Sequence, residues 1–317
     1  MNHLEEMKAE KKGFIYCVNH KYEWWDSHLM APTPMRLDDS TIRIYTGCWS
    51  KEQISRIGYI DVDVNNPVIV KNICKDPVLE IGSKGCFDDN GVFPAHVYKF
   101  SQKKIYLYYT GFQLSDKIPF FNFSGLAVSI DNGNTFERYS KAPVLDRSDE
   151  GLFTRAGISI YPDEKKGGFH CVYSAGSGWF FLNGKERPIY EVFYQKSEDG
   201  VHFSRHGEKI VACDLEIEHG LGRPQIIKLG EWYYVFYTRR IIKGMNYFLG
   251  CSRTRDFVKW ERMDSVFNDV SLGVEGEFDN EMIYFPGVLQ ISEHKAFCFY
   301  TGNHYGETGI GYIVLHF

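Results

Sequence analysis

The chain has 317 residues, of which 44% are hydrophobic and 24% are charged, and its formal net charge is −5 at neutral pH. A slightly acidic chain without a basic stripe is a poor match to a nucleic-acid-binding protein, so we expect no nucleic-acid partner. No apolar run reaches the roughly 18 residues of a membrane-spanning helix, so we expect no membrane partner either.

The first twelve residues form a charged, amphipathic segment that lacks the apolar core of a signal peptide. The run 13–18 that follows is a predicted strand with no partner in its own part of the chain. The eight cysteines contain no CxxC pair, and several lie in predicted strands, where a free cysteine acts as a small buried hydrophobe. A cytoplasmic location is the simplest compartment for such a chain.

From there on, an aromatic-rich apolar run ending in a tyrosine recurs at a nearly constant interval. The tyrosines are Tyr45, Tyr109, Tyr173, Tyr237 and Tyr300, so successive intervals are 64, 64, 64 and 63 residues. A constant interval of this kind is the signature of a repeated supersecondary unit. The sequence therefore predicts five copies of one unit.

Each unit has the pattern of several strands. A proline or small residue opens the first strand, 13 to 17 residues before the tyrosine: Pro32, Pro94, Ala156, Pro224 and Pro286. Proline suits the first residue of a strand because its φ is fixed and it has no N–H to donate. The tyrosine run is the second strand, and the third is predicted at 56–61, 125–129, 190–195, 247–251 and 309–314. Short fourth strands follow polar turns in units two to four.

Four antiparallel strands per unit, arranged radially, make the blades of a β-propeller. The fifth unit ends after its third strand, and the run 13–18 would supply the missing one. We therefore expect an all-β fold in which residues 13–317 form a single five-bladed propeller closed by the N-terminal strand, with 1–12 as a separate charged segment.

Two sets of residues should then converge on the central funnel. One set is an acid five or six positions before each opening residue: Asp26, Asp88 with Asp89, Glu150, Glu218 and Glu281. The other set follows each tyrosine and includes Trp49, Phe112, Trp179, Arg240 and Tyr305. Carboxylates interleaved with aromatic rings and arginines suit glycosyl transfer, in which one acid protonates the leaving oxygen and a second acts as base or nucleophile.

Asp89, Glu218 and Glu281 are the predicted catalytic acids. Glu218 is favoured as the general acid because His219 and Arg223 flank it, and the arginines suit a carboxylate or phosphate of the substrate. The predicted substrate-binding residues are Asp26, His28, Asp88, Glu150, Arg155, Trp179, His219, Arg223, Arg240, Asp279, Asn303 and Tyr305.

Structural roles compete with these assignments. Acids before strands also cap turns, which accounts for about half of the set, and Arg155 or Arg223 can pair with Glu150 or Glu218 instead of a ligand. No histidines have a spacing that suits zinc, and Asp131 to Asn134 is better explained as a blade turn than as a calcium loop. We expect no metal and no cofactor.

Several segments carry a family resemblance, among them Leu221-Gly222-Arg223-Pro224, Phe278-Asp279-Asn280-Glu281 and Tyr300-Thr301-Gly302-Asn303-His304-Tyr305. They resemble the five-bladed propeller glycoside hydrolases (families 32, 43, 62, 68, 117 and 130), and most closely an uncharacterised bacterial group associated with surface-polysaccharide genes. The resemblance implies the propeller fold and a carbohydrate substrate. The family motifs do not carry catalytic roles over, because residues 28–34, at the first innermost strand, contain no acid.

The leading hypothesis is a carbohydrate-active enzyme that cleaves or transfers a glycosyl unit, with phosphate-dependent cleavage left open. The alternative is a propeller that binds a glycan or nucleotide sugar without catalysis, and a third is a scaffold for protein partners. The sequence leaves the sugar, the mechanism and the oligomeric state open.

Overall fold

The computed structural model describes residues 7–101 and 103–317, so the first half of the charged segment 1–12 lies outside it. Over the described residues the chain forms twenty strands, two 3₁₀ turns, η1 (Lys243–Met245) and η2 (Asp264–Phe267), and one helical turn, α1 (Asn303–Gly306). The prediction of an all-β fold is confirmed.

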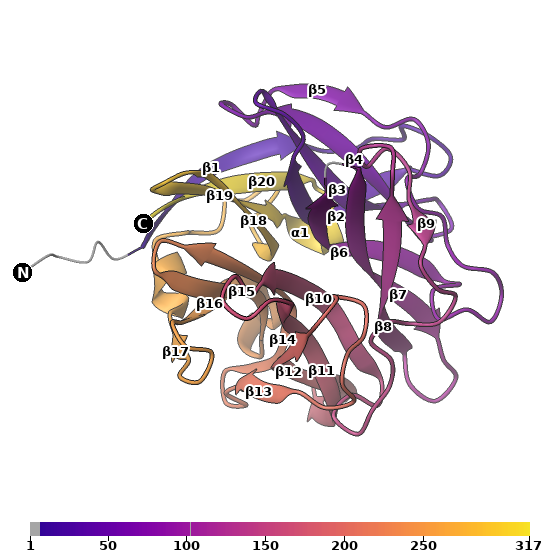
Figure 1. Cartoon of the computed structure of the whole chain (residues 1–317). Coiled ribbons are helices and arrows are strands. Elements are labelled where there is room, and N and C mark those ends of the chain that lie inside the picture. The colour runs from indigo at the N-terminus through magenta and orange to yellow at the C-terminus, as the bar shows by residue number, and fades with distance from the viewer. Residues whose placement is uncertain (1–6, 102) are drawn as a thin grey trace, which may run out of the picture.

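The strands fall into consecutive groups of antiparallel neighbours around a common centre (Figure 1). The first two groups are β2 (Ser27–Arg36), β3 (Thr41–Trp49), β4 (Ser55–Asp63) and β5 (Val70–Ile73), then β6 (Gly91–Ser101), β7 (Lys104–Leu114), β8 (Phe120–Ser129) and β9 (Glu137–Arg138). The next two are β10 (Thr154–Pro162), β11 (Phe169–Leu182), β12 (Lys185–Ser197) and β13 (Glu208–Val211), then β14 (Glu218–Leu229), β15 (Trp232–Ile241), β16 (Tyr247–Thr254) and β17 (Glu261–Arg262).

The last group joins the two ends of the described chain. It contains β18 (Tyr284–Ser292), β19 (Lys295–Thr301) and β20 (Ile310–His316), and β1 (Lys8–Tyr16) pairs antiparallel with β20. In Figure 1 the indigo β1 lies beside the yellow β20. Strand β1 begins at Lys8, so residues 8–12 of the predicted charged segment belong to this sheet.

The innermost strands differ from the sequence prediction in one respect. Their opening residues lie inside the strands, because β6 starts at Gly91, before Pro94, and β14 starts at Glu218, before Pro224. At these residues the pairing register shifts, for example between Pro94 and His96. A proline removes one ladder hydrogen bond, which an irregularity in the strand tolerates and a regular central strand does not.

The five repeated tyrosines are fully buried, and the residue after each has a hydroxyl group. Four of these hydroxyls bond to the innermost strand of the following group. Thr110 and Thr238 accept from the backbone N–H of Gly157 and Phe285, and Ser174 donates to the Leu221 carbonyl. Thr301 accepts from the N–H of Ala31, and so links the last group to the first.

Candidate functional site

A central cavity of about 380 Å³ opens where the innermost strands meet the ends of the second and third strands. Its wall includes Asn90, Phe112, Asn122, Thr154 and Tyr190. The volume lies in the range of small-molecule pockets, and aromatic rings with a few polar groups are the usual lining of such sites.

The charged side chains of the cavity wall are all positive. Arg223 and Arg240 are its charged side chains, and no aspartate or glutamate among the described residues lines the cavity. Within the described part of the chain, neither arginine has a carboxylate at ion-pair distance. The cavity is therefore a positively charged, partly apolar space.

Arg223 forms the floor of the cavity and holds the inner strands together. Its guanidinium donates to the carbonyls of Pro286 at 2.5 Å, Ala31 at 3.0 Å and Pro32 at 2.9 Å, and to the Thr33 hydroxyl at 2.6 Å. Burial lowers the pKa of Arg223 to about 9, so the group keeps its charge at neutral pH. Its strained backbone, with φ at +49°, is consistent with a fixed structural position.

Arg240 lies on the cavity wall, near the end of β15. Its Nη1 donates to the Tyr190 hydroxyl at 2.9 Å, and its guanidinium carbon lies 5.0 Å from the centre of the Tyr247 ring. Burial opposes its charge, but Tyr190, Tyr247 and Tyr305 raise its pKa above the ordinary value. Arg240 is thus a permanent positive charge held by aromatic neighbours rather than by an acid.

Aromatic rings form the mouth of the cavity between the first and last groups. Trp49 stacks on His28 at 4.2 Å between ring centres and faces Tyr305 at 6.3 Å. Tyr305 sits in α1, where both His304 and Tyr305 have positive φ, at +50° and +59°. A turn with two such residues is strained, and strain of this kind is common where a side chain is held at a ligand site.

The acids predicted for the funnel lie mostly in a different place. Each buried tyrosine hydroxyl of groups two to five contacts a carboxylate that also has a cation, and we call these the tyrosine–acid clusters. They are Tyr109–Asp88–Arg138, Tyr173–Glu150–Arg155, Tyr237–Asp264–Arg262 and Tyr300–Asp279–Lys11. A buried hydroxyl requires an acceptor, so Asp88, Glu150 and Asp279 have a structural explanation.

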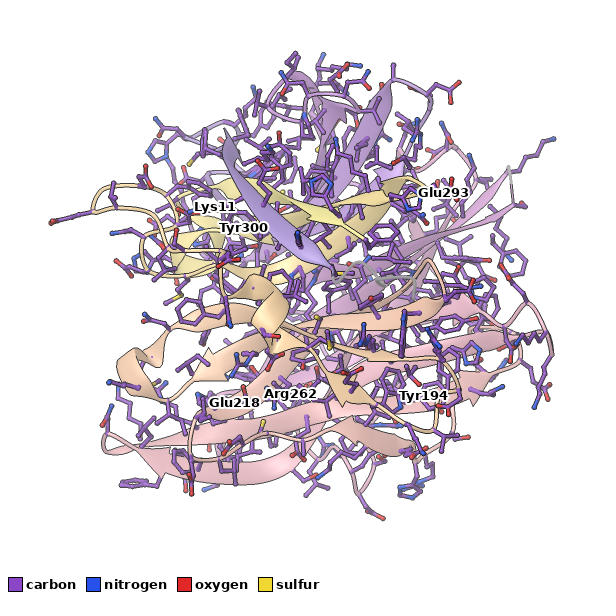
Figure 2. All side chains as sticks on the ribbon, turned by 90° about the vertical axis from the view of Figure 1, so that its left-hand side faces the viewer. Lys11, Tyr194, Glu218, Arg262, Glu293 and Tyr300 are labelled. Atoms are coloured by element: carbon purple, nitrogen blue, oxygen red, sulfur yellow. The ribbon has the colours of Figure 1, made fainter. Side chains whose placement is uncertain are left out.

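The cluster of Tyr237, Asp264 and Arg262 also includes Glu218. This fully buried carboxylate accepts from Arg239 Nε at 2.7 Å and from Arg262 Nη2 at 2.5 Å. Figure 2 shows Glu218 beside Arg262, well separated from the labelled Lys11 and Tyr300 of the last cluster. The two residues predicted to flank Glu218 with charge do not contact it. The Arg223 guanidinium donates to carbonyls of the innermost strands, such as that of Ala31, and the His219 ring contacts the Pro188 carbonyl at 3.1 Å.

Asp89, Glu281 and Asp26 lie outside the clusters. Asp89 Oδ2 accepts from the Gly85 N–H at 2.8 Å, while its Oδ1 is buried without a hydrogen-bond partner. The next residue, Asn90, lines the cavity. Glu281 is exposed, 3.5 Å from His304, and Asp26 pairs with His20 at 2.6 Å. Of the three predicted catalytic acids, Asp89 is thus the one next to the cavity wall.

The other predicted binding residues are also spread out. Arg155 belongs to a tyrosine–acid cluster, and Trp179 packs on Phe153 at 4.6 Å between ring centres. The buried Asn303 side chain accepts from two backbone N–H groups, those of Glu281 and Met282, and so holds the α1 turn. Among all the predicted site residues, Arg223, Arg240 and Tyr305 line the cavity.

Sequence reasoning missed two tyrosines of the wall, Tyr190 and Tyr247. Tyr247 pairs with Arg240 across β15 and β16, so the strand register carried the missing signal. No cluster of three His, Cys, Asp or Glu side chains suited to a metal ion occurs among the described residues. Nor does this part of the chain contain a helix long and apolar enough to cross a membrane.

Comparison with other sequences gives distant relatives. No protein-family model matches the chain. It is 27% identical over 312 residues, 98% of this chain and 99% of the relative, to the uncharacterized protein Rv1502 of Mycobacterium tuberculosis. It is also 30% identical over 140 residues to the 1,2-beta-oligomannan phosphorylase of a Thermoanaerobacter species. This match covers 42% of this chain and 46% of that protein.

Solved structures give a clearer answer about the fold. A glycoside hydrolase superposes with a TM-score of 0.70 at 17% identity, over 96% of this chain and 91% of that one. A structure from work on the GH130 family of mannoside phosphorylases superposes with a TM-score of 0.69 at 14% identity, over 99% and 95%. The chain has the fold of the propeller glycoside hydrolases. The resemblance inferred from the sequence is confirmed at this level, and identities this low say nothing further about the reaction.

Proposed function

We propose that this protein binds a carbohydrate that carries an anionic group in the central cavity. The observation that carries the proposal is the charge of the wall, in which Arg223 and Arg240 have no carboxylate partner among the described residues. The proposal treats the five strand groups as blades of one closed propeller, with β1 as the closing strand. The rings of Trp49, Phe112 and Tyr305 offer flat apolar faces to a sugar.

Arg240 is the residue that we assign to the anionic group. Arg223 already donates to a hydroxyl and to four carbonyls, those of Pro94, Pro286, Ala31 and Pro32, so its contribution is the field of its charge. Among the described residues Arg240 has a single side-chain hydrogen bond, to Tyr190, which leaves donors for a carboxylate or phosphate. A neutral sugar would leave both buried charges without a counter-ion.

A second candidate is cleavage of a glycosidic bond by phosphate. Hydrolysis by this fold class uses two carboxylates that flank the bond, and the cavity wall has none. Phosphorolysis needs one acid, because the phosphate oxygen forms the new bond to the sugar as the old glycosidic bond breaks and the acid protonates the leaving oxygen. Asp89 favours this candidate, since it adjoins the wall and has no cationic partner.

Binding is tested by calorimetry against matched pairs of sugars, such as glucose with glucose 6-phosphate and with glucuronate. We expect the anionic member of a pair to bind, and Arg240→Gln to weaken it by about tenfold to a hundredfold, as for the loss of a hydrogen bond to a charged group. Arg255→Gln is the matched control, because Arg255 stacks on Trp232 outside the cavity and also lacks an acid. Equal binding of neutral and anionic sugars would contradict the proposal.

Catalysis is tested separately with phosphate and oligosaccharides. Release of a sugar phosphate that disappears in Asp89→Asn, with sugar binding retained, would support phosphorolysis. A stable Asp89→Asn variant with undiminished turnover would remove Asp89 from the reaction. Binding without any product, in the wild type, would favour the non-catalytic alternative.

A further inference from the structure

One hairpin extends much further beyond its buried tyrosine, toward the cavity end of the strands, than the others do. The β11–β12 hairpin stays paired as far as Leu182 and Lys185, nine residues beyond Tyr173. By comparison, β3 ends four residues beyond its tyrosine, β7 five, β15 four and β19 one. The β11–β12 hairpin of the third group therefore forms a raised wall, and the β7–β8 hairpin of the second group is the next longest.

The raised wall has an exposed apolar surface. Phe181 is 71% exposed at the tip of β11, and Leu114 and Leu152 are also exposed. Trp179 lies two residues before Phe181, so both side chains are on the same face of the strand. We call Leu114, Phe120, Leu152, Trp179 and Phe181 the rim strip.

The rim strip is continuous with the cavity. Leu114 pairs with Phe120, and Phe120 lies 5.6 Å from Phe112 between ring centres, with both rings in the cavity wall. Strand β8 then runs beside β10 through the pair Asn122 and Thr154, both also in the wall. On the far side of this pair Phe153 packs on Trp179, and Ser177 Oγ accepts from the Leu152 N–H at 3.1 Å.

We propose that the rim strip is an outer carbohydrate subsite, so that the ligand is an oligosaccharide or polysaccharide chain rather than a single sugar. The inference rests on the proposed function. The terminal, anionic sugar lies in the cavity, and the following sugar units run over Phe120, Trp179 and Phe181. Apolar patches that continue a binding cavity mark interaction sites, and aromatic faces beside polar groups suit the two faces of a sugar ring.

Charges at the hairpin tip favour a glycan over an anionic lipid surface. Lys185, Glu186 and Arg187 stand next to the aromatic residues on the paired strand. Membrane-binding surfaces collect positive charge around their aromatic residues, whereas this one mixes the two signs.

The test measures affinity against chain length. The probes are fluorescently labelled glycans from monosaccharide to hexasaccharide, including 1,2-β-linked mannose chains and uronate-containing chains. We expect the affinity to rise with the length of the glycan. Phe181→Ser should weaken the binding of the longest glycan by about fivefold and leave the affinity for the shortest bound glycan unchanged. Phe100→Ser is the control, because Phe100 is also exposed but lies far from the cavity. It is near the end of β6, whereas Gly91, at the start of β6, lines the cavity.

Several outcomes would overturn the inference. If the shortest glycan binds as tightly as the longest, the outer subsite is absent, while Arg240→Gln still tests the cavity on its own. Loss of a dimer in Phe181→Ser by sedimentation velocity would assign the strip to a second copy of the chain. Loss of binding to anionic vesicles in that variant would assign it to a lipid surface. Absence of binding to any glycan would overturn both this inference and the proposed function.

Discussion

The tyrosine–acid clusters and the central cavity contain the same kinds of residues in opposite arrangements. In the clusters each carboxylate has a cation and a tyrosine hydroxyl, as in Asp279 with Lys11 and Tyr300. In the cavity Arg223 and Arg240 have no acid, and aromatic rings and carbonyls surround them. The clusters are electrically satisfied and serve the fold, whereas the cavity retains charge that a ligand can neutralise.

The largest expected effect on stability comes from replacing Arg223, the cavity residue that has the most hydrogen bonds to the innermost strands but no acid among the described residues. Arg223→Met would leave carbonyls of three strand groups and the Thr33 hydroxyl without their donor. We expect the free energy of unfolding to fall by at least about 3 kcal/mol, measured by urea denaturation. Arg255→Met is the control, and equal stability of the two variants would show that Arg223 is not a structural centre.

Glu218 gives the next largest effect and decides between a structural and a catalytic role. Glu218→Gln would leave Arg239 and Arg262 facing an uncharged amide in a buried place. We expect a loss of about 2 to 3 kcal/mol in unfolding free energy, near the lower end for broken buried ion pairs because both arginines are partly exposed. A variant of native stability that binds sugar but has lost turnover would return Glu218 to the catalytic set.

The clusters themselves can be compared with one another. Tyr109→Phe and Tyr300→Phe each remove one hydroxyl that donates to a buried acid, Asp88 or Asp279. We expect each to lower the unfolding free energy by about 1 kcal/mol without changing sugar binding. The measurement is urea denaturation together with calorimetry. A change in sugar binding with unchanged stability would place that tyrosine in the ligand site instead.

The smallest expected effect is a dependence of the unfolding free energy on pH, caused by the buried histidines. Burial lowers the pKa of His96 to about 3 and that of His219 to about 4, below the value of about 6.5 in the unfolded chain. The unfolded state therefore binds more protons below pH 6.5, so stability is full above that pH and declines as the pH falls toward the folded values. Urea denaturation at several pH values should show this decline.

A matched pair of variants isolates the contribution of one histidine. His219→Asn should flatten the decline, because the side chain that takes up a proton on unfolding is gone. His304→Gln is the control, since the His304 side chain is exposed and does not belong to the buried histidines. An unchanged slope in His219→Asn would show that this imidazole does not control the pH dependence.

The repeat of tyrosines allowed the strand pattern to be predicted, but the positions of the acids were harder. Asp88 precedes a strand in the same way whether it lines a funnel, caps a turn or accepts from Tyr109. The deciding partner, Arg138, is 50 residues further along the chain. A usable signal existed in the tyrosines, because a buried hydroxyl in every unit requires an acceptor in every unit.

Of the three predicted binding arginines, Arg223 and Arg240 line the cavity and Arg155 does not. Arg240 follows its tyrosine on a strand that leads to the cavity, so its place depends on local geometry alone. The role of Arg223 depends on carbonyls from strands more than 60 residues away in either direction, such as those of Ala31 and Pro286. The exposed aromatic rings and the mixed positive and negative side chains of the β11–β12 hairpin depend on its unusual length. The other repeats lack this extra length, so the repeat pattern could not predict it.

The pairing of β1 with β20 also bears on how the molecule is made. A ribosome delivers Lys8 before Ile310, so the strand Lys8–Tyr16 has to wait until β2 to β19 have been made before its hydrogen-bonding partner exists. Contacts of such long sequence separation form slowly, and an unpaired strand is prone to join the wrong partner meanwhile. The first half of β1 contains four charged residues, Lys8, Glu10, Lys11 and Lys12, and charges on an unpaired strand are a known defence against mispairing.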